Sequence, residues 1–409
     1  MAECSSRRPR GCSTICLPID QQRYQQIIDS PQQFRHTLDQ FYRDMPELFP
    51  KDMAWGYTLK DDRVSARLGL RLRRIRCKAS GAAFTIRPSF ALPYMVGRTD
   101  EVEGPLFLRA FAVPFWAIAR VFGKNPTYWY RLEVSLGRNS IVGTTARRAD
   151  VPEHLLADEH HQSRDGEKNY IATTVGAGCC LGACLAQTAG AEDLQGAYEV
   201  FKAEAENVQP DYRPATVSVD GWAATRQAWL ALFPVVVLLR CFLHGWLSIR
   251  SRGKLSAVFA ALSQKVWDAY HAVNRRGFAQ RLRRLREWVR GQALTAWLVE
   301  QVEKLCGRSQ EYGEAYNHPR GHRTSNMLDR LMRSMNRYFD AGQHLHGSKE
   351  AGERRCRAWA LLHNFRPWGA ETQRENGWCS PAERLNQHRY HDNWLQNLLV
   401  SASLAGFRR

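Results

Sequence analysis

The stretch that decides the fold is Ala215–Trp222, with the sequence ATVSVDGW. Its β-branched residues Thr216, Val217 and Val219 predict a buried strand, and Asp220 closes that strand. A carboxylate at the end of a strand is held rigidly, as a residue that binds a metal ion requires.

Strand and helix patterns alternate on both sides of this stretch. We expect three strands and a helix before it, then a second helix and a fifth strand after it. This order is that of an RNase H-like mixed-sheet core, so the predicted fold class is α/β. The expected strands are 155–160, 170–178, 180–186, 216–220 and 235–243, and the expected helices are 191–208 and 223–232.

Two further aspartates complete a set of three acids. Asp158 closes an apolar run that turns acidic, LLADEH at 155–160, and Asp329 lies where TSNMLDRLMRSMN at 324–336 begins a helix. Two strand-end carboxylates and one helix carboxylate can converge on a pair of Mg²⁺ ions, and such a site performs phosphoryl transfer on nucleic acid. Asp158, Asp220 and Asp329 are therefore the predicted catalytic and metal-binding residues.

The residues that follow Asp158 are not expected to bind the metal ions. Glu159 should point to the opposite face of the strand. His160 and His161 should diverge from each other as exposed polar residues, because successive side chains alternate across a strand.

Composition favours a polyanionic partner. The 409 residues include 58 Lys and Arg against 40 Asp and Glu, a formal charge of +18, and such a surface suits phosphates. An arginine-rich genome is the alternative explanation. The apolar run at 232–239 is too short to cross a membrane, no signal peptide follows Arg7, Arg8 and Arg10, and the eleven cysteines fit reduced thiols.

An N-terminal DNA-binding part is expected to precede the core. Residues 1–60 have a helical tendency, and residues 61–100 form a basic β region that resembles a degenerate zinc ribbon, with Cys77 present but Ser80 where a second cysteine is expected. The basic strands either contact phosphates or present a solvated face. The candidate phosphate contacts are Arg71, Arg73, Arg74 and Arg76.

Residues 101–150 predict a helix-turn-helix followed by a basic linker at 137–150. Pro114 suits the start of one helix, and the segment 123–126 makes a turn before a second helix at 127–136. Tyr128, Trp129 and Arg131 are its candidate DNA contacts, although a helical hairpin of this length is also common in protein cores.

The catalytic core is expected at 151–244 and 323–345, around an all-helical insertion at 245–322. The many arginines of the insertion either bind phosphates or lie on a solvated face. Residues 346–409 form a C-terminal region that should pack against the core.

Four motifs in order resemble the Mutator-like class of bacterial insertion-sequence transposases, over about residues 150–340. They are Asp158, the segment VDGW at 219–222, the pair Cys241 and His244 in CFLH, and TSNMLD at 324–329. Trp222 and Asn326 also belong to these motifs. The chain departs from the family at Asp329, where the family pattern has Glu. A ligand on Asp329 would sit about 1.5 Å further back, and Glu314 is the fallback for the third acid.

The resemblance implies a DDE/D transposase that cleaves 3′ ends and transfers them to a target with two Mg²⁺ ions, for which Mn²⁺ could substitute. The resemblance further implies that the partner is double-stranded DNA, both as element ends and as target, and that the protein assembles as a homo-oligomer on DNA. It implies no membrane association and a location in the bacterial cytoplasm at the nucleoid. The rival functions are an RNase H-fold nuclease without strand transfer and a catalytically inactive or domesticated DNA-binding protein.

Overall fold

A mixed five-stranded sheet lies at the centre of the protein, which is described by a computed structural model over residues 13–66, 68–93 and 95–407. Its strand order is β7-β6-β5-β8-β9. Within this sheet β5, β6 and β7 pair antiparallel, whereas β8 and β9 run parallel to β5. The strands are β5 (His154–Arg164), β6 (Glu167–Gly176), β7 (Cys179–Ala186), β8 (Thr216–Val219) and β9 (Val237–Arg240).

Tight hairpins set the register of the first three strands. Asp165 and Gly166 join β5 to β6, Ala177 and Gly178 join β6 to β7, and all four residues have positive φ. Two-residue turns of this kind match the twist of the strands. The expected succession of three strands, helix, strand, helix and strand is therefore present, and the protein belongs to the α/β class with a mixed sheet.

Helices cover both faces of this sheet, and β5 shows why. Leu155 and Ala157 pack with α7 (Ala191–Val208) and α8 (Ala223–Leu232), whereas Leu156 packs with α14 (Asn326–Asp340) and α15 (Lys349–Phe365). A strand buried on both faces loses the alternation of polar and apolar residues, as β5 does in its first half.

The bounds of several strands differ from those expected, β5 and β9 among them. β9 covers only Val237–Arg240, because Phe242 already begins α9. Asp158 lies in the middle of β5 rather than at its end, since β5 continues to Arg164 in its hairpin with β6.

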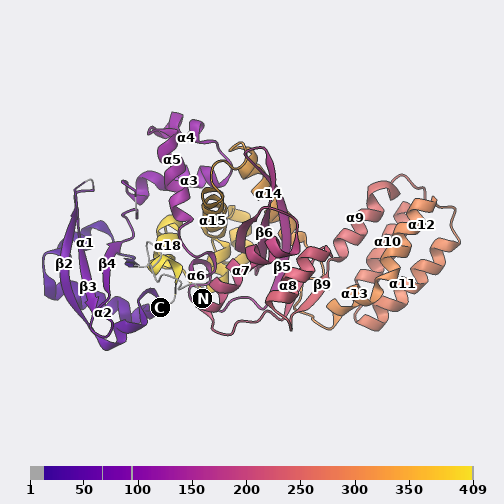
Figure 1. Cartoon of the computed structure of the whole chain (residues 1–409), viewed down its shortest axis with the longest axis horizontal. Helices are drawn as coiled ribbons and strands as arrows, with labels where there is room; N and C mark the ends of the chain where they lie inside the picture. Colours follow the sequence, from indigo (N-terminus) through magenta and orange to yellow (C-terminus); the bar gives the residue numbers. More distant parts are fainter. Residues whose placement is uncertain (1–12, 67, 94, 408–409) are drawn as a thin grey trace.

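The helical insertion between β9 and α14 has an apolar core of its own and extends from one end of the molecule (Figure 1). Phe278 and Leu282 of its arginine-rich helix are fully buried in that core. Its helices are α9 (Phe242–Gly253), α10 (Phe259–Tyr270), α11 (Arg275–Arg290), α12 (Ala296–Gly307), α13 (Ser309–Gly313) and the 3-10 turn η3 (Glu314–Tyr316).

A second sheet, in the order β1-β4-β3-β2, lies at the opposite end of the molecule (Figure 1). Residues 14–17 pair with residues 85–88, so both sides of position 60 belong to one sheet. Arg7, Arg8 and Arg10, which entered the expectation that the chain has no signal peptide, lie outside the described residues. The elements are β1 (Thr14–Leu17), α1 (Gln21–Ile28), α2 (Pro31–Asp44), η1 (Pro46–Leu48), η2 (Lys51–Trp55), β2 (Tyr57–Ser65), β3 (Leu70–Cys77) and β4 (Ala83–Pro88).

Three helices connect this sheet to the core, namely α3 (Thr99–Ala110), α4 (Phe115–Phe122) and α5 (Pro126–Leu136). The segment 137–150, expected to be a basic linker, contains α6 (Ile141–Thr145), and its Ile141, Val142 and Arg147 are buried. Part of this segment therefore packs in the protein interior, although it contains several arginines.

The C-terminal region packs against the central sheet, as expected, through α15, whose Trp359 lies in the same apolar cluster as Leu156; its last part packs elsewhere. Leu395, Leu398 and Leu404 share an apolar core with β1, α1 and α2. The remaining elements are α16 (Ala370–Asn376), α17 (Pro381–Asn386), α18 (Trp394–Ser401) and η4 (Ser403–Gly406). No helix in the described ranges is both long and apolar enough to cross a bilayer.

Candidate functional site

Asp158 and Asp220 occupy equivalent positions on neighbouring parallel strands. The last paired residues of β5 and β8 are Leu156 and Ser218, and each aspartate comes two residues after its member of that pair. Neighbouring strands lie about 4.8 Å apart, and the two-residue spacing keeps each aspartate on the face of its paired residue. For Asp158 this is the face of Leu156, which is covered by α14.

Asp329 lies in the first turn of α14, the helix that packs on this face of the sheet. The hydroxyl of Ser325 lies 3.1 Å and 3.2 Å from the two carboxylate oxygens of Asp329 and donates to them. The side chain is thereby oriented by the residue that precedes its own helix.

Cys241 joins this helix to the strand that carries Asp220. The amide of Cys241 donates to the carbonyl of Val219 at 2.9 Å. Its Sγ lies 3.3 Å from the Ser325 Oγ and accepts from the Ser325 amide at 3.2 Å. Cys241 thus bridges the end of β8 and the start of the Asp329 helix.

His244 lies beside Cys241 and carries a positive charge toward the acids. Its interaction with the Cys241 thiol, helped by the fields of Asp158 and Asp220, raises the pKa of His244 to about 9. The same interaction holds the pKa of Cys241 below its usual value in spite of burial. The two residues are therefore an electrostatic part of the site.

Asp158 lies in the field of the other two acids. Burial, together with the negative fields of Asp220 and Asp329, raises the pKa of Asp158 to about 6, against the opposing effects of the Glu159 amide and His244. The structure therefore brings together the three predicted carboxylates, which are 62 and 109 positions apart in the sequence.

The donor chemistry of these three residues fits a hard cation. Among the described residues, no Lys or Arg forms an ion pair with Asp158, Asp220 or Asp329. One oxygen of Asp158 accepts from the Glu159 amide and one of Asp220 from the Trp222 amide, which leaves the second oxygen of each for another partner.

The same acids do not form a closed metal cage. Nowhere in the described ranges do three or more His, Cys, Asp or Glu side chains gather closely enough to hold a metal ion by themselves. Mg²⁺ is usually bound by one or two carboxylates, several waters and substrate phosphates rather than by an all-protein cage. The arrangement suits that mode of binding.

The neighbours of Asp158 confirm one expectation and correct another. Glu159 points to the opposite face, where it accepts hydrogen bonds from Tyr198 at 2.7 Å and from Thr225 at 2.9 Å; burial raises its pKa to about 7. His161 is exposed, but His160 is buried, so the expectation of two exposed histidines was wrong for His160. The strand continues under α14 beyond Asp158, so His160 is buried as well.

The other motif residues have mixed roles. Trp222 is half-buried against Tyr170, with ring centroids 6.1 Å apart, and Asn326 is exposed at the first position of α14. Glu314, the fallback acid, belongs to the insertion and pairs with Arg275 at 3.2 Å.

Most of the arginines of the basic β region are used within the N-terminal sheet. Arg71 pairs with Asp29 and Asp62, Arg74 pairs with Asp61, and Arg73 donates to the carbonyl of Ile28. These partners hold α1 and β2 against β3. Arg76 is exposed and has no ion pair among the residues that the structure describes.

The two helices of the expected helix-turn-helix are α4 and α5. Arg131 is exposed and Tyr128 is half-buried. Trp129 is only 3% exposed, and its indole N–H donates to the carbonyl of Gly123 at 2.9 Å. Trp129 therefore packs the turn instead of facing a ligand, which corrects its assignment as a DNA contact.

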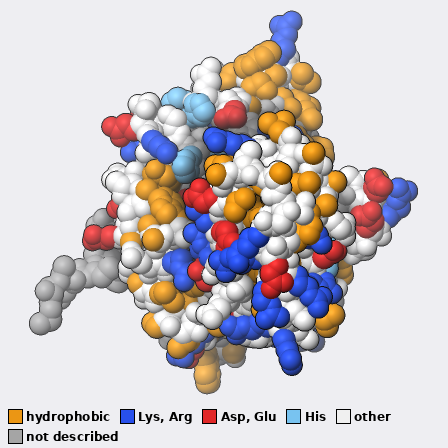
Figure 2. Space-filling view, turned by 90° about the vertical axis from the view of Figure 1, so that its right-hand side faces the viewer, with side chains coloured by type: hydrophobic (Ala, Val, Ile, Leu, Met, Phe, Trp, Pro, Cys, Tyr) orange, Lys and Arg blue, Asp and Glu red, His pale blue; other side chains and the backbone are white. Residues whose placement is uncertain are grey.

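The exposed end of the helical insertion mixes both signs of charge (Figure 2). Arg286 and Arg290 of α11 pair with Glu303, and Arg275 pairs with Glu314. Part of this basic surface is therefore neutralised within the insertion.

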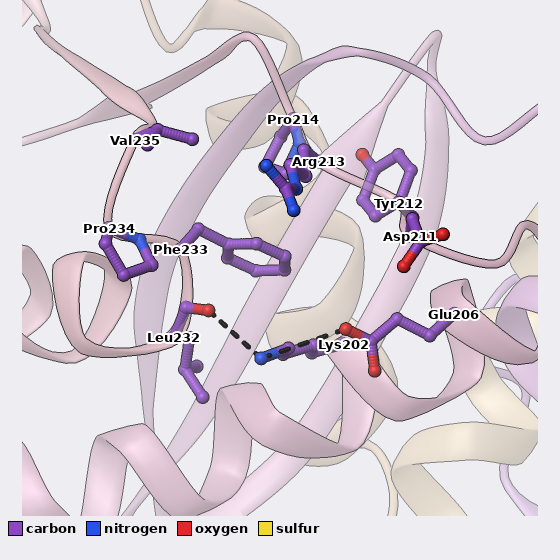
Figure 3. A pocket seen from close by; sticks show the side chains of 10 residues that line it. All are labelled: Lys202, Glu206, Asp211, Tyr212, Arg213, Pro214, Leu232, Phe233, Pro234 and Val235. Carbon is purple, nitrogen blue, oxygen red and sulfur yellow. Dashed lines mark hydrogen bonds and ion pairs between the residues drawn. The ribbon is translucent and has the colours of Figure 1, made fainter.

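A separate pocket of about 320 Å³ lies at the opposite end of β8 and β9, before these strands begin (Figure 3). Lys202 lies inside it and donates to the carbonyl of Leu232 at 3.1 Å, with Glu206 3.8 Å away. Lys202 already has partners, and the pocket is remote from Asp220, so it is not part of the candidate site.

Sequence patterns missed Ser325, Tyr198 and Thr225. Ser325 carries the contacts between Cys241 and Asp329, and its position four residues before Asp329 was the available signal, since such residues are neighbours across one helical turn. Tyr198 and Thr225 hold Glu159 and could be found only from the fold.

No protein-family model matches the chain, and a search of curated proteins finds no match.

Proposed function

We propose that this protein is a DDE/D-type transposase related to the Mutator-like class, which cleaves DNA 3′ ends and joins them to target DNA. The observation that carries the proposal is the placement of Asp158, Asp220 and Asp329, which come from two neighbouring strands and one facing helix, with the fields of Asp220 and Asp329 raising the pKa of Asp158. An acid cluster without a Lys or Arg partner suits divalent cations and a phosphodiester.

The sheet supports an RNase H-like core as the finer description of the fold. Three antiparallel strands lead into two strands parallel to the first, with helices on both faces. A helical insertion separates β9 from the helix with the last acid. Each feature matches the expectation drawn from the order of the motifs.

Asp158, Asp220 and Asp329 would hold two Mg²⁺ ions, or Mn²⁺ in their place. Bound Mg²⁺ supplies the acidity that activates an attacking water or 3′-hydroxyl and stabilises the leaving oxygen. The chain itself orients Asp329 through Ser325, and His244, charged beside the acids, would donate to an incoming phosphate. The exposed Arg131 of α5 supports recognition of DNA by the α4–α5 pair.

A strand-transfer assay tests this function. Purified protein is incubated with a pre-cleaved element end, taken from the terminal repeats that flank its coding DNA, and with a plasmid target and Mg²⁺. We expect joined products from the wild type and from Asp150→Asn, a matched change at an exposed acid. We expect no joined products from Asp158→Asn, although this variant should still bind the element end.

The other outcomes identify the rival functions. A cut target without joined product indicates a nuclease. Binding without cutting or joining, equal in the wild type and Asp158→Asn, indicates a DNA-binding protein without catalysis.

A further inference from the structure

A strongly basic pocket lies on the helix that carries Asp329, outside the acid site. Its volume is about 270 Å³, and it is formed between α14, the turn at 110–112 that follows α3, and the residue that follows α15. The charged side chains that line it are all arginines: Arg330, Arg333, Arg337 and Arg366. We call this feature the arginine pocket.

Three of these arginines form one stripe along α14. Arg330, Arg333 and Arg337 are spaced three and four residues apart, so they share one face of the helix. All three side chains are exposed, and none of these guanidinium groups forms an ion pair or hydrogen bond with another described residue. Three neighbouring cations without a carboxylate leave a strong positive field for an external anion.

The fourth arginine is fixed as the floor of the pocket. Arg366 donates to the carbonyl of Ala110 at 2.6 Å and to the hydroxyl of Ser334 at 3.3 Å, and it lies 4.3 Å from the ring centre of Phe111. Burial lowers its pKa only to about 10, so it remains charged at neutral pH. A held guanidinium loses little freedom on binding an anion.

The spacing of the stripe suits a nucleic-acid backbone. Arg330 and Arg337 are separated by about 10 Å along the helix axis, which corresponds to about three base-pair steps of a DNA strand. The stripe begins at the residue after Asp329 and ends beside the segment that leads into α4. A strand that follows it therefore runs between the α4–α5 pair and the acid site.

We propose that the arginine pocket binds consecutive phosphates of the DNA strand that leads from the α4–α5 helices to Asp329. This inference rests on the proposed function and adds the path of the DNA. Arg330, Arg333 and Arg337 contact the phosphates, and Arg366 closes the floor of the pocket.

Binding of a fluorescent 30-base-pair duplex, and of the same strand unpaired, tests the path. Anisotropy is measured in EDTA over a series of salt concentrations, so that catalysis plays no part. The variant Arg330→Gln/Arg333→Gln/Arg337→Gln is compared with Arg23→Gln/Arg35→Gln/Arg43→Gln, which removes three exposed charges from α1 and α2. Matched thermal unfolding curves establish that both variants fold.

The α14 variant is expected to bind the duplex at least about tenfold more weakly than wild type near 0.1 M salt, and its slope of log K against log salt should fall by about 2 to 3. The control should stay within about twofold. Equal losses of duplex affinity in both variants, or no loss in the α14 variant, would overturn the proposed role of the arginine pocket. The strand-transfer assay would still test the proposed function separately. Preference for the unpaired strand alone overturns a duplex path, and failure of the wild type to bind either probe overturns the proposed function as well.

Discussion

The Sγ of Cys241 lies 3.3 Å from the hydroxyl of Ser325, a residue 84 positions later in the chain. The same hydroxyl contacts both oxygens of Asp329. A residue at the end of the sheet thus orients the acid on the facing helix through one serine.

Removal of this link should impair catalysis without removing a ligand. We expect Ser325→Ala to lower the rate of strand transfer about 10- to 100-fold, as loss of a group that orients a metal ligand does. Cys241→Ala should give a similar loss. The double variant should lose little more than either single variant, and additive losses measured in the same assay would contradict a shared path.

Loss of one acid should stabilise the protein when no metal is present. Asp158→Asn removes a charge that lies in the field of Asp220 and Asp329, so we expect its free energy of unfolding in EDTA to rise by about 1 kcal/mol. Addition of Mg²⁺ should raise the melting temperature of the wild type but not that of the variant. A wild type whose melting temperature is unchanged by millimolar Mg²⁺ and Mn²⁺ would contradict the metal site.

Local sequence signals predicted the central elements well. The observed bounds of α7 and α8 are those expected, because Ala-rich apolar spacing starts and stops sharply at both. The hairpin turn at Asp165 and Gly166 also has a local signal, since both residues tolerate positive φ.

Features that depend on distant partners were not predictable from local patterns. The pattern around Arg71 and Arg74 predicted a phosphate-binding face, but in the fold these arginines form ion pairs with Asp29 and Asp61. Trp129 faces the interior because the α4–α5 turn closes over it. The acids could be selected from their order along the chain, but their meeting depends on the register of β5 with β8, which no single segment encodes.

A buried ion pair ties the α3–α5 helices together and to α14. The Nε of Arg109 lies 2.7 Å from Glu133, both side chains are at most 1% exposed, and the guanidinium stacks 4.0 Å from the ring centre of Tyr338. Arg109→Ala should reduce the free energy of unfolding by about 3 to 5 kcal/mol, since it leaves a buried charge unpaired. The apolar double variant Arg109→Met/Glu133→Leu should recover most of this loss in urea unfolding.

His363 should make the protein less stable in mild acid. Its ring stacks on Trp359 with centroids 5.3 Å apart, and burial, with the field of Arg366, lowers its pKa to about 3. The unfolded chain takes up the proton first, near pH 6.5, so this contribution is complete above that pH and is lost as the pH falls toward 3. Between pH 7 and pH 5 we expect the free energy of unfolding to fall by about 2 kcal/mol more in the wild type and in His36→Gln, a change at an exposed histidine, than in His363→Phe.

Asp329→Glu tests whether the shorter acid limits the proposed strand-transfer activity. Asp329 is one methylene shorter than the glutamate of the resembled family, about 1.5 Å, but Ser325 already holds its carboxylate. If the protein has adapted to aspartate, the longer side chain loses the Ser325 contact, and we expect strand transfer to fall about tenfold or more. Asp329→Asn should abolish it, and Asp340→Glu, at the exposed end of the same helix, should leave it unchanged. A gain of activity in Asp329→Glu would show instead that aspartate weakens the site, and equal activity of Asp329→Asn and wild type would remove Asp329 from the catalytic set.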